Sequence, residues 1–256
     1  AQVRTLLARV AARDGLGWEG ETVVETGEGA LIIDLCSGKG LGALLLSRLL
    51  PAARVVMADA NEDMYQEQRR GLEPEINPLL LPLLLTFLLG CALYVHCIAL
   101  LLRALDHVAS RPNLEFVTLD LFSHEAVTAV RELARDSPTG CVVLLLGMHA
   151  CGALSPRLLA LASHLEEVDG CALCPCCIKG GLGHHVKQRA RACGRPNYDV
   201  LLEVLAGVAV RECGERADVA ISHDVDMLSP KNGFVTILKR TAPPSLHLAH
   251  PEDRTH

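Results

Sequence analysis

The stretch ALIIDLCSGKGLG (residues 30–42) decides the fold class, because it joins an apolar run to a glycine-rich turn before a helical pattern. A short apolar run bounded by glycine is typical of a buried strand. Glycine lets the backbone pass close to a ligand, and the first N–H groups of a helix attract anions. The stretch therefore predicts a strand, a ligand-binding turn and a helix, a pattern that also suits a dinucleotide.

The same alternation of apolar run and helical pattern continues along the chain. Further strands are predicted at residues 53–59, 114–120, 141–147, 169–175 and 233–240. Continuous apolar strands that alternate with helices indicate a parallel sheet covered on both faces. We therefore expect a doubly wound α/β domain over residues 30–240, with a helical lead-in over 1–29 and an unstructured tail over 241–256.

Composition narrows the classes of function. The chain has 256 residues, 50% of them hydrophobic and 21% charged, which suits one large folded domain. A net charge of −6 opposes nucleic-acid binding through overall charge, and an aromatic content of 3% opposes binding through base stacking. Binding through a local basic patch stays compatible with this composition.

The cysteines number eleven, an odd count, and no secretory signal is recognisable. We expect free or metal-binding thiols in a reducing compartment, the cytoplasm or the nucleus.

Residues 79–102 contain no Asp, Glu, Lys or Arg and are long enough to span a membrane. A single span would place the strands that end at Asp59 and at Asp120 on opposite sides of a bilayer, where they could not share a sheet. We therefore favour a hydrophobic helix that covers the sheet or meets a partner, or an insertion. A hairpin at the membrane surface stays as the minor alternative.

Acidic residues stand at the ends of three predicted strands, at Asp34, Asp59 and Asp120. The carboxyl ends of parallel strands meet at one edge of a sheet, where such folds bind their ligands. An acidic residue after the second strand is placed to bind ribose hydroxyls. The three carboxylates favour a nucleoside-like ligand, and helix capping is the alternative.

This order of motifs resembles the class I S-adenosylmethionine-dependent methyltransferases. The resemblance implies a Rossmann-like, mostly parallel, seven-stranded sheet with an apolar insertion between its second and third strands. It also implies S-adenosylmethionine as the cofactor. Asp34 would open the first motif, Asp59 would bind ribose, and Asp120 with Leu121 would bind adenine. Gly38 and Gly40 would form the turn around the methionine part, and Cys36 stands where the family usually has its first glycine.

Three further motifs make the resemblance more specific: MHACG (residues 148–152), LCPCC (173–177) and SPKN (229–232). They are similar, in the same order, to the methyltransferase-like branch found in glutathione S-transferase C-terminal-domain-containing proteins. Related motifs occur in a tRNA 2'-O-methyltransferase family. The resemblance spans nearly all of residues 30–240 but does not fix the substrate. It also indicates that residues 65–104 are an insertion, since residues 60–64 read naturally into 105–108.

The histidine and cysteines of these motifs follow two neighbouring predicted strands, so they should face the methyl donor. His149 is our candidate for a general base or an acceptor-positioning group, and a histidine bonded within its loop is the alternative. Cys176 and Cys177 are expected to line the acceptor pocket. A zinc site is the competing interpretation, with Cys174, Cys176, Cys177 and His184 as ligands.

No acidic residue occurs between Gly170 and Tyr198, and basic residues stand at Lys179, Lys187, Arg189, Arg191 and Arg195. Such a patch suits a phosphate-bearing acceptor, which slightly favours RNA, although a solvated helix face would look the same. The sequence thus predicts a methyltransferase. The alternatives are a non-catalytic cofactor-binding scaffold that contacts a partner or membrane through its apolar segment, and a zinc-binding protein.

Overall fold

The computed structural model describes residues 2–15, 17–38, 40–61, 111–178, 180–225, 227 and 231–240. The expectations for the insertion at 65–104, its apolar part at 79–102, Lys179 and the tail at 241–256 fall outside these residues. Among the helices in the described part of the chain, none combines the length and the apolar character that crossing a membrane requires.

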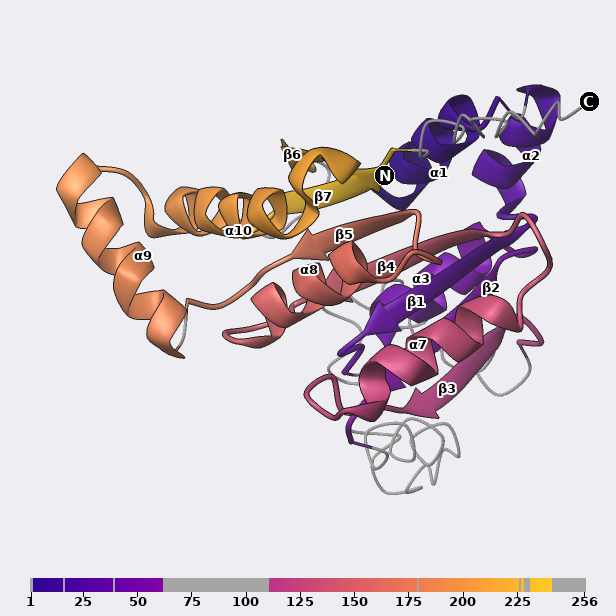
Figure 1. The fold of residues 1–256 in the computed structure, drawn as a ribbon, viewed down its shortest axis with the longest axis horizontal. Coiled ribbons are helices and arrows are strands. Elements are labelled where there is room, and N and C mark those ends of the chain that lie inside the picture. The colour runs from indigo at the N-terminus through magenta and orange to yellow at the C-terminus, as the bar shows by residue number, and fades with distance from the viewer. Residues whose placement is uncertain are drawn as a thin grey trace, which may run out of the picture.

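The strands form one sheet of seven in the order β3-β2-β1-β4-β5-β7-β6 (Figure 1). Every pairing from β3 to β5 is parallel, whereas β7 runs antiparallel to both β5 and β6. The expected seven-stranded, mostly parallel sheet is therefore confirmed. The strands are β1 (Ala30–Leu35), β2 (Arg54–Asp59), β3 (Leu114–Thr118), β4 (Val142–Met148), β5 (Gly170–Cys174), β6 (Ala217–His223) and β7 (Gly233–Lys239).

Helices cover both faces of the sheet, because side chains along each central strand alternate between two cores. In β1, Leu31 and Ile33 belong to one core, while Ala30 and Ile32 belong to the other. The first core is covered by α7 (Glu125–Arg135), α8 (Leu154–His164), α9 (Gly180–Cys193) and α10 (Asn197–Cys213). The second is covered by α1 (Gln2–Arg13), α2 (Gly17–Thr26) and α3 (Leu41–Leu49). The sheet is thus doubly wound.

The edge strand β6 is the element that the apolar pattern does not reveal. Its side chains are mostly exposed or half-buried, so ADVAISH lacks the continuous apolar run of the central strands. Register with β7 defines it instead, from Ala217 opposite Lys239 to His223 opposite Gly233. A short 3-10 helix, η2 (Gly214–Arg216), connects α10 to it.

The first helix is fastened to the sheet by Arg13. One guanidinium nitrogen lies 2.6 Å from a carboxylate oxygen of Asp169, and another donates to the carbonyl of Lys239 at 2.8 Å. The second carboxylate oxygen of Asp169 accepts the N–H of Val143 at 2.9 Å. Since the buried face of α1 also belongs to the core, the lead-in packs as part of the domain.

Arg13→Ala is expected to lower the free energy of unfolding by about 1–3 kcal/mol, because Asp169 and a strand-end carbonyl lose their donor. Arg135→Ala is the control, since Arg135 is 68% exposed in its pair with Glu167. Its cost should stay below about 1 kcal/mol. Denaturant unfolding measures both, and equal losses would contradict the role assigned to Arg13.

Candidate functional site

The glycine turn lies where the order of strands reverses. Strand β1 has β2 on one side and β4 on the other. The helix after β1, α3, lies on one face of the sheet, and the helix after β4, α8, lies on the opposite face. At such a switch point the connections diverge and leave a crevice at the carboxyl ends of the strands, where α/β proteins of this type bind ligands.

Three residues of the turn have left-handed backbones: Cys36 with φ of 59°, Gly38 with 54° and Gly40 with 63°. Gly40 caps α3 without any side-chain hydrogen bond, while the N–H of Ala43 in the first turn bonds the carboxyl of Asp34. At Cys36 the left-handed backbone costs roughly 1–2 kcal/mol for a residue with a Cβ. This strain explains physically why related motifs have glycine at that position.

Asp59 connects the end of β2 to the glycine turn. One carboxylate oxygen accepts the N–H of Gly38 at 2.9 Å, and the other accepts the N–H of Asn61 at 3.0 Å. Two backbone donors therefore orient the carboxylate of Asp59, which we predict to bind ribose. Each oxygen keeps a lone pair for a further donor.

The charges of the three predicted carboxylates all act on the thiol of Cys36. Burial of this side chain, with the negative charges of Asp59, Asp34 and Asp120, raises the pKa of the thiol to about 12. The thiol therefore stays protonated and unreactive near neutral pH. Parallel strands bring the three acidic residues to one place, as expected.

The adenine-binding residues that we predicted differ from each other in exposure. Asp120 is exposed and accepts the N–H of Phe122 at 2.9 Å, so its carboxylate also organises the turn after β3. The side chain of Leu121 is buried in the core. Its carbonyl accepts Nε of Arg157 at 2.9 Å. Leu121 can therefore offer a ligand only its backbone.

Asp34 is the most strongly perturbed acid of the site. It is 1% exposed, and this burial raises the pKa of the carboxyl to about 7, a rise that the N–H groups of Ala43 and Met148 oppose. The negative charge of Asp59 raises the pKa further. Perturbed acids of this kind cluster at functional sites.

Two buried polar atoms of the turn lack a hydrogen-bond partner among the described residues: Oδ1 of Asp34 and Oγ of Ser37. Buried polar atoms are nearly always satisfied by protein, water or ligand. Unsatisfied atoms beside a left-handed glycine turn fit a polar ligand at this place. The amino-acid part of S-adenosylmethionine carries an ammonium donor and a carboxylate acceptor, so these residues fit the expected cofactor.

A cavity of about 450 Å³ adjoins the turn. Gly42 and Met148 both line it and both lie beside Asp34: a Cβ on Gly42 would stand 3.4 Å from Oδ2 of Asp34 and 3.6 Å from Cγ of Met148. The rest of its lining is largely apolar and includes Leu45, Leu46, Leu49 and Phe234. Sequence patterns gave no sign of this cavity, because residues from α1, α3, β4 and β7 form it together.

The histidine and cysteine motifs meet at the ends of β4 and β5. The N–H of His149 donates to the carbonyl of Cys174 at 2.9 Å, which extends the pairing of these strands. Beyond that point Cys151 and Cys176 are joined as a disulfide, although the composition favoured free or metal-binding thiols. Adjacent parallel strands explain the contact, because the Cα atoms lie 6.0 Å apart, within the usual range for a disulfide.

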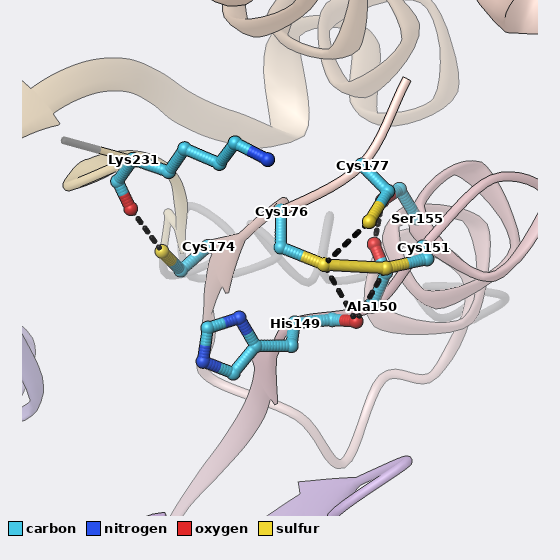
Figure 2. Close-up of a disulfide and its surroundings, with 8 residues drawn as sticks. All are labelled: His149, Ala150, Cys151, Ser155, Cys174, Cys176, Cys177 and Lys231. Atoms are coloured by element: carbon cyan, nitrogen blue, oxygen red, sulfur yellow. Dashed lines mark hydrogen bonds between the residues drawn. A yellow bond between two sulfur atoms is a disulfide. The ribbon is translucent and has the colours of Figure 1, made fainter. Parts of the chain in front are cut away.

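His149 is exposed and has a left-handed backbone with φ of 63°. Figure 2 shows its imidazole pointing away from the sulfur atoms of Cys151 and Cys176, while its carbonyl lies against them. Strained backbones of this kind cluster at active sites. The ring is therefore available to a molecule bound over the end of β4.

The structure groups different metal-ligand candidates from those that spacing suggested. The thiol of Cys174 donates to the carbonyl of Lys231 at 3.5 Å, and His184 is exposed on α9. Neither belongs to the group of close ligand atoms that Cys176 and Cys177 form with Cys151. Sequence reasoning did not include Cys151 in the metal set because only the pairing of β4 with β5 brings it to the other two.

The predicted basic patch lies on and after α9, which extends beside α10 at the end of the molecule away from α2 (Figure 1). Its described members, Lys187, Arg189, Arg191 and Arg195, are all exposed. Glu203 of α10 forms ion pairs with Arg189 and Arg195. The positive charge of this surface is therefore smaller than the sequence implied.

The chain matches no protein-family model and no curated protein. Among solved structures it is similar to a predicted O-methyltransferase from Agrobacterium tumefaciens, with 16% identity, a TM-score of 0.41, and coverage of 92% of this chain and 80% of that one. A putative rRNA methylase from Clostridium thermocellum has 13% identity and a TM-score of 0.42, with coverage of 89% of this chain and 97% of that one. The Methanococcus jannaschii fibrillarin pre-rRNA processing protein has 9% identity and a TM-score of 0.43, with coverage of 88% of this chain and 75% of that one.

The raised pKa of Asp34 predicts a loss of stability as the pH rises. Between the unfolded value of 3.8 and the folded value of about 7, the native state holds a proton that the unfolded chain has released. The free energy of unfolding should therefore fall with pH across that window.

Asp34→Asn should remove this dependence. From pH 5 to pH 8 the wild type should lose about 2–3 kcal/mol relative to the variant in the absence of cofactor. Urea unfolding at both pH values measures the difference, with Asp136→Asn on the exposed end of α7 as the control. Parallel pH profiles for wild type and Asp34→Asn would contradict a protonated, buried Asp34.

Proposed function

We propose that the chain is an S-adenosylmethionine-dependent methyltransferase. The observation that carries the proposal is the left-handed glycine turn at the switch point of the sheet, where Asp59 accepts the N–H of Gly38 and the buried Asp34 has an oxygen that is unsatisfied within the described part of the chain. The motif resemblance supports it independently, since MHACG and LCPCC follow β4 and β5 at the same edge.

The cofactor side of the site is assigned from hydrogen-bonding capacity. The start of α3, where Gly40 offers no capping side chain, suits the cofactor's carboxylate, and the remaining lone pairs of Asp59 suit the ribose hydroxyls. Asp120 and the backbone of Leu121 suit the adenine edge. When bound, S-adenosylmethionine supplies an electrophilic methyl group on a sulfonium sulfur.

The acceptor side is assigned to the loops after β4 and β5. Methyl transfer needs an aligned nucleophile and, for most acceptors, a group that accepts its proton. The exposed imidazole of His149 supplies that group, and Cys176 and Cys177 line the adjoining surface.

RNA is the favoured acceptor class. Lys187 and Arg191 of α9 form no ion pair with another described residue, so their charges are available to phosphate groups. Because Glu203 neutralises part of this surface, RNA binding should depend on these two side chains rather than on the whole basic set.

Asp59→Ala should weaken S-adenosylmethionine binding roughly 5- to 150-fold, the equivalent of about 1–3 kcal/mol of lost hydrogen bonds. Calorimetric titration of the full chain measures the affinity. Asp136→Ala, an exposed acid distant from the turn in sequence, should bind as the wild type does. Equal affinities for wild type and Asp59→Ala would refute the ribose assignment.

His149→Ala should slow methyl transfer roughly 10²–10⁴-fold, because the acceptor loses its proton-accepting partner. Binding of S-adenosylmethionine should be unchanged, since the ring lies on the acceptor side. Single-turnover transfer to an RNA pool and calorimetry separate the two steps. Full activity in the variant would exclude His149 from proton transfer. Loss of cofactor binding would contradict its assignment to the acceptor side.

A further inference from the structure

Three cysteine sulfurs gather where the loops after β4 and β5 meet (Figure 2). Those of Cys151, Cys176 and Cys177 all lie within 4.8 Å of one another, and Cys176 and Cys177 are 3.3 Å apart. All three residues are half-buried. Within the described ranges, no other three or more His, Cys, Asp or Glu residues are grouped closely enough to hold a metal ion.

Strand register brings these residues together. Met148 lies opposite Cys174 at the end of the parallel β4–β5 ladder. Three residues beyond each strand, Cys151 and Cys177 are therefore level with each other, and Cys176 lies next to them. The carbonyl of His149 contacts the sulfur atoms of Cys151 and Cys176. The cluster is thus positioned by the rigid centre of the sheet.

The spacing of the sulfurs suits a soft divalent cation. Zinc binds thiolates at about 2.3 Å in a tetrahedral arrangement, which separates two sulfur ligands by about 3.8 Å. Sulfurs that already lie within 4.8 Å of one another need only small side-chain rotations to surround one ion. Hard cations such as Mg²⁺ prefer oxygen and are poorly served by three thiols.

The disulfide between Cys151 and Cys176 is the oxidised form of the same cluster. A small-molecule thiol reduces it by two electrons, which yields two protein thiols and the disulfide of the reductant. Together with Cys177 the reduced chain then offers three sulfur ligands. Zinc binding releases the three thiol protons to solvent, and the two positive charges of the ion offset most of the charge of the resulting thiolates.

We propose that reduced Cys151, Cys176 and Cys177 bind one Zn²⁺ ion whose fourth position is completed by water. Three protein ligands with one open position are typical of zinc sites that act on small molecules rather than purely structural ones. The ion fastens the β4 loop to the β5 loop beside His149. The proposal concerns metal binding alone and does not depend on methyl transfer.

The test uses the full chain without a histidine tag, purified with reductant and with zinc in the growth medium. Elemental analysis should give about one zinc per chain, and Co²⁺ exchanged into the site should show a thiolate charge-transfer band. Cys151→Ser, Cys176→Ser and Cys177→Ser should each lower zinc affinity by at least about tenfold. Cys193→Ser, exposed at the end of α9, should keep full metal content.

Cys174→Ser distinguishes this site from the set that includes Cys174 and His184. Its thiol contacts the carbonyl of Lys231 and not the cluster, so this variant should also retain zinc. Loss of zinc in Cys174→Ser equal to that in Cys177→Ser would overturn the proposed ligand set.

Alkylation of the wild type tests the proposal even where a serine variant fails to fold. With zinc, Cys151, Cys176 and Cys177 should react at least about tenfold more slowly with iodoacetamide than after chelation, while Cys193 reacts alike in both. Equal reactivity with and without zinc, or a zinc content near zero in fully reduced protein, would overturn the proposal. A Cys151–Cys176 disulfide that persists in reductant would overturn it as well.

Discussion

Parallel pairing sets Ala30 of β1 opposite Val142 of β4 and Asp34 opposite Leu146. This register aligns the carboxyl ends of the two strands at the point where the sheet order reverses. The glycine turn after β1 and the histidine–cysteine loop after β4 therefore open into the same crevice, although more than a hundred residues separate them. The cofactor site and the acceptor side meet through this pairing, and the neighbouring pairing of β4 with β5 adds the cysteine cluster to the same edge.

Several energetically unfavourable features of the fold lie together at that edge of the sheet. Asp34 is held in the core with a pKa of about 7, and Cys36 and His149 both have left-handed backbones. Each feature lowers the stability of the folded chain, and each lies where a ligand would meet the sheet. Helices packed on both faces of the sheet hold these residues in place, which lets a site keep charged and strained groups that the core alone would not favour.

The apolar runs of β1, β4 and β5 and the meeting of Asp34, Asp59 and Asp120 follow from local sequence, because buried parallel strands leave continuous patterns and their ends share one edge. Other features depend on contacts that local sequence does not record. Strand β6 is an exposed edge defined by register with β7. Cys151 joins Cys176 and Cys177 only through strand pairing, and Glu203 reduces the basic patch from a different helix.

We propose above all that S-adenosylmethionine binds at the turn between β1 and α3. Amide hydrogen exchange of the full chain with and without S-adenosylmethionine tests it most directly, because it locates the bound ligand without prior choice of a variant. With the cofactor bound, amide exchange should slow over residues 34–44 and 57–61 and change little in α10 and β6. Unchanged exchange at the turn under saturating cofactor, or protection confined to other elements, would contradict it.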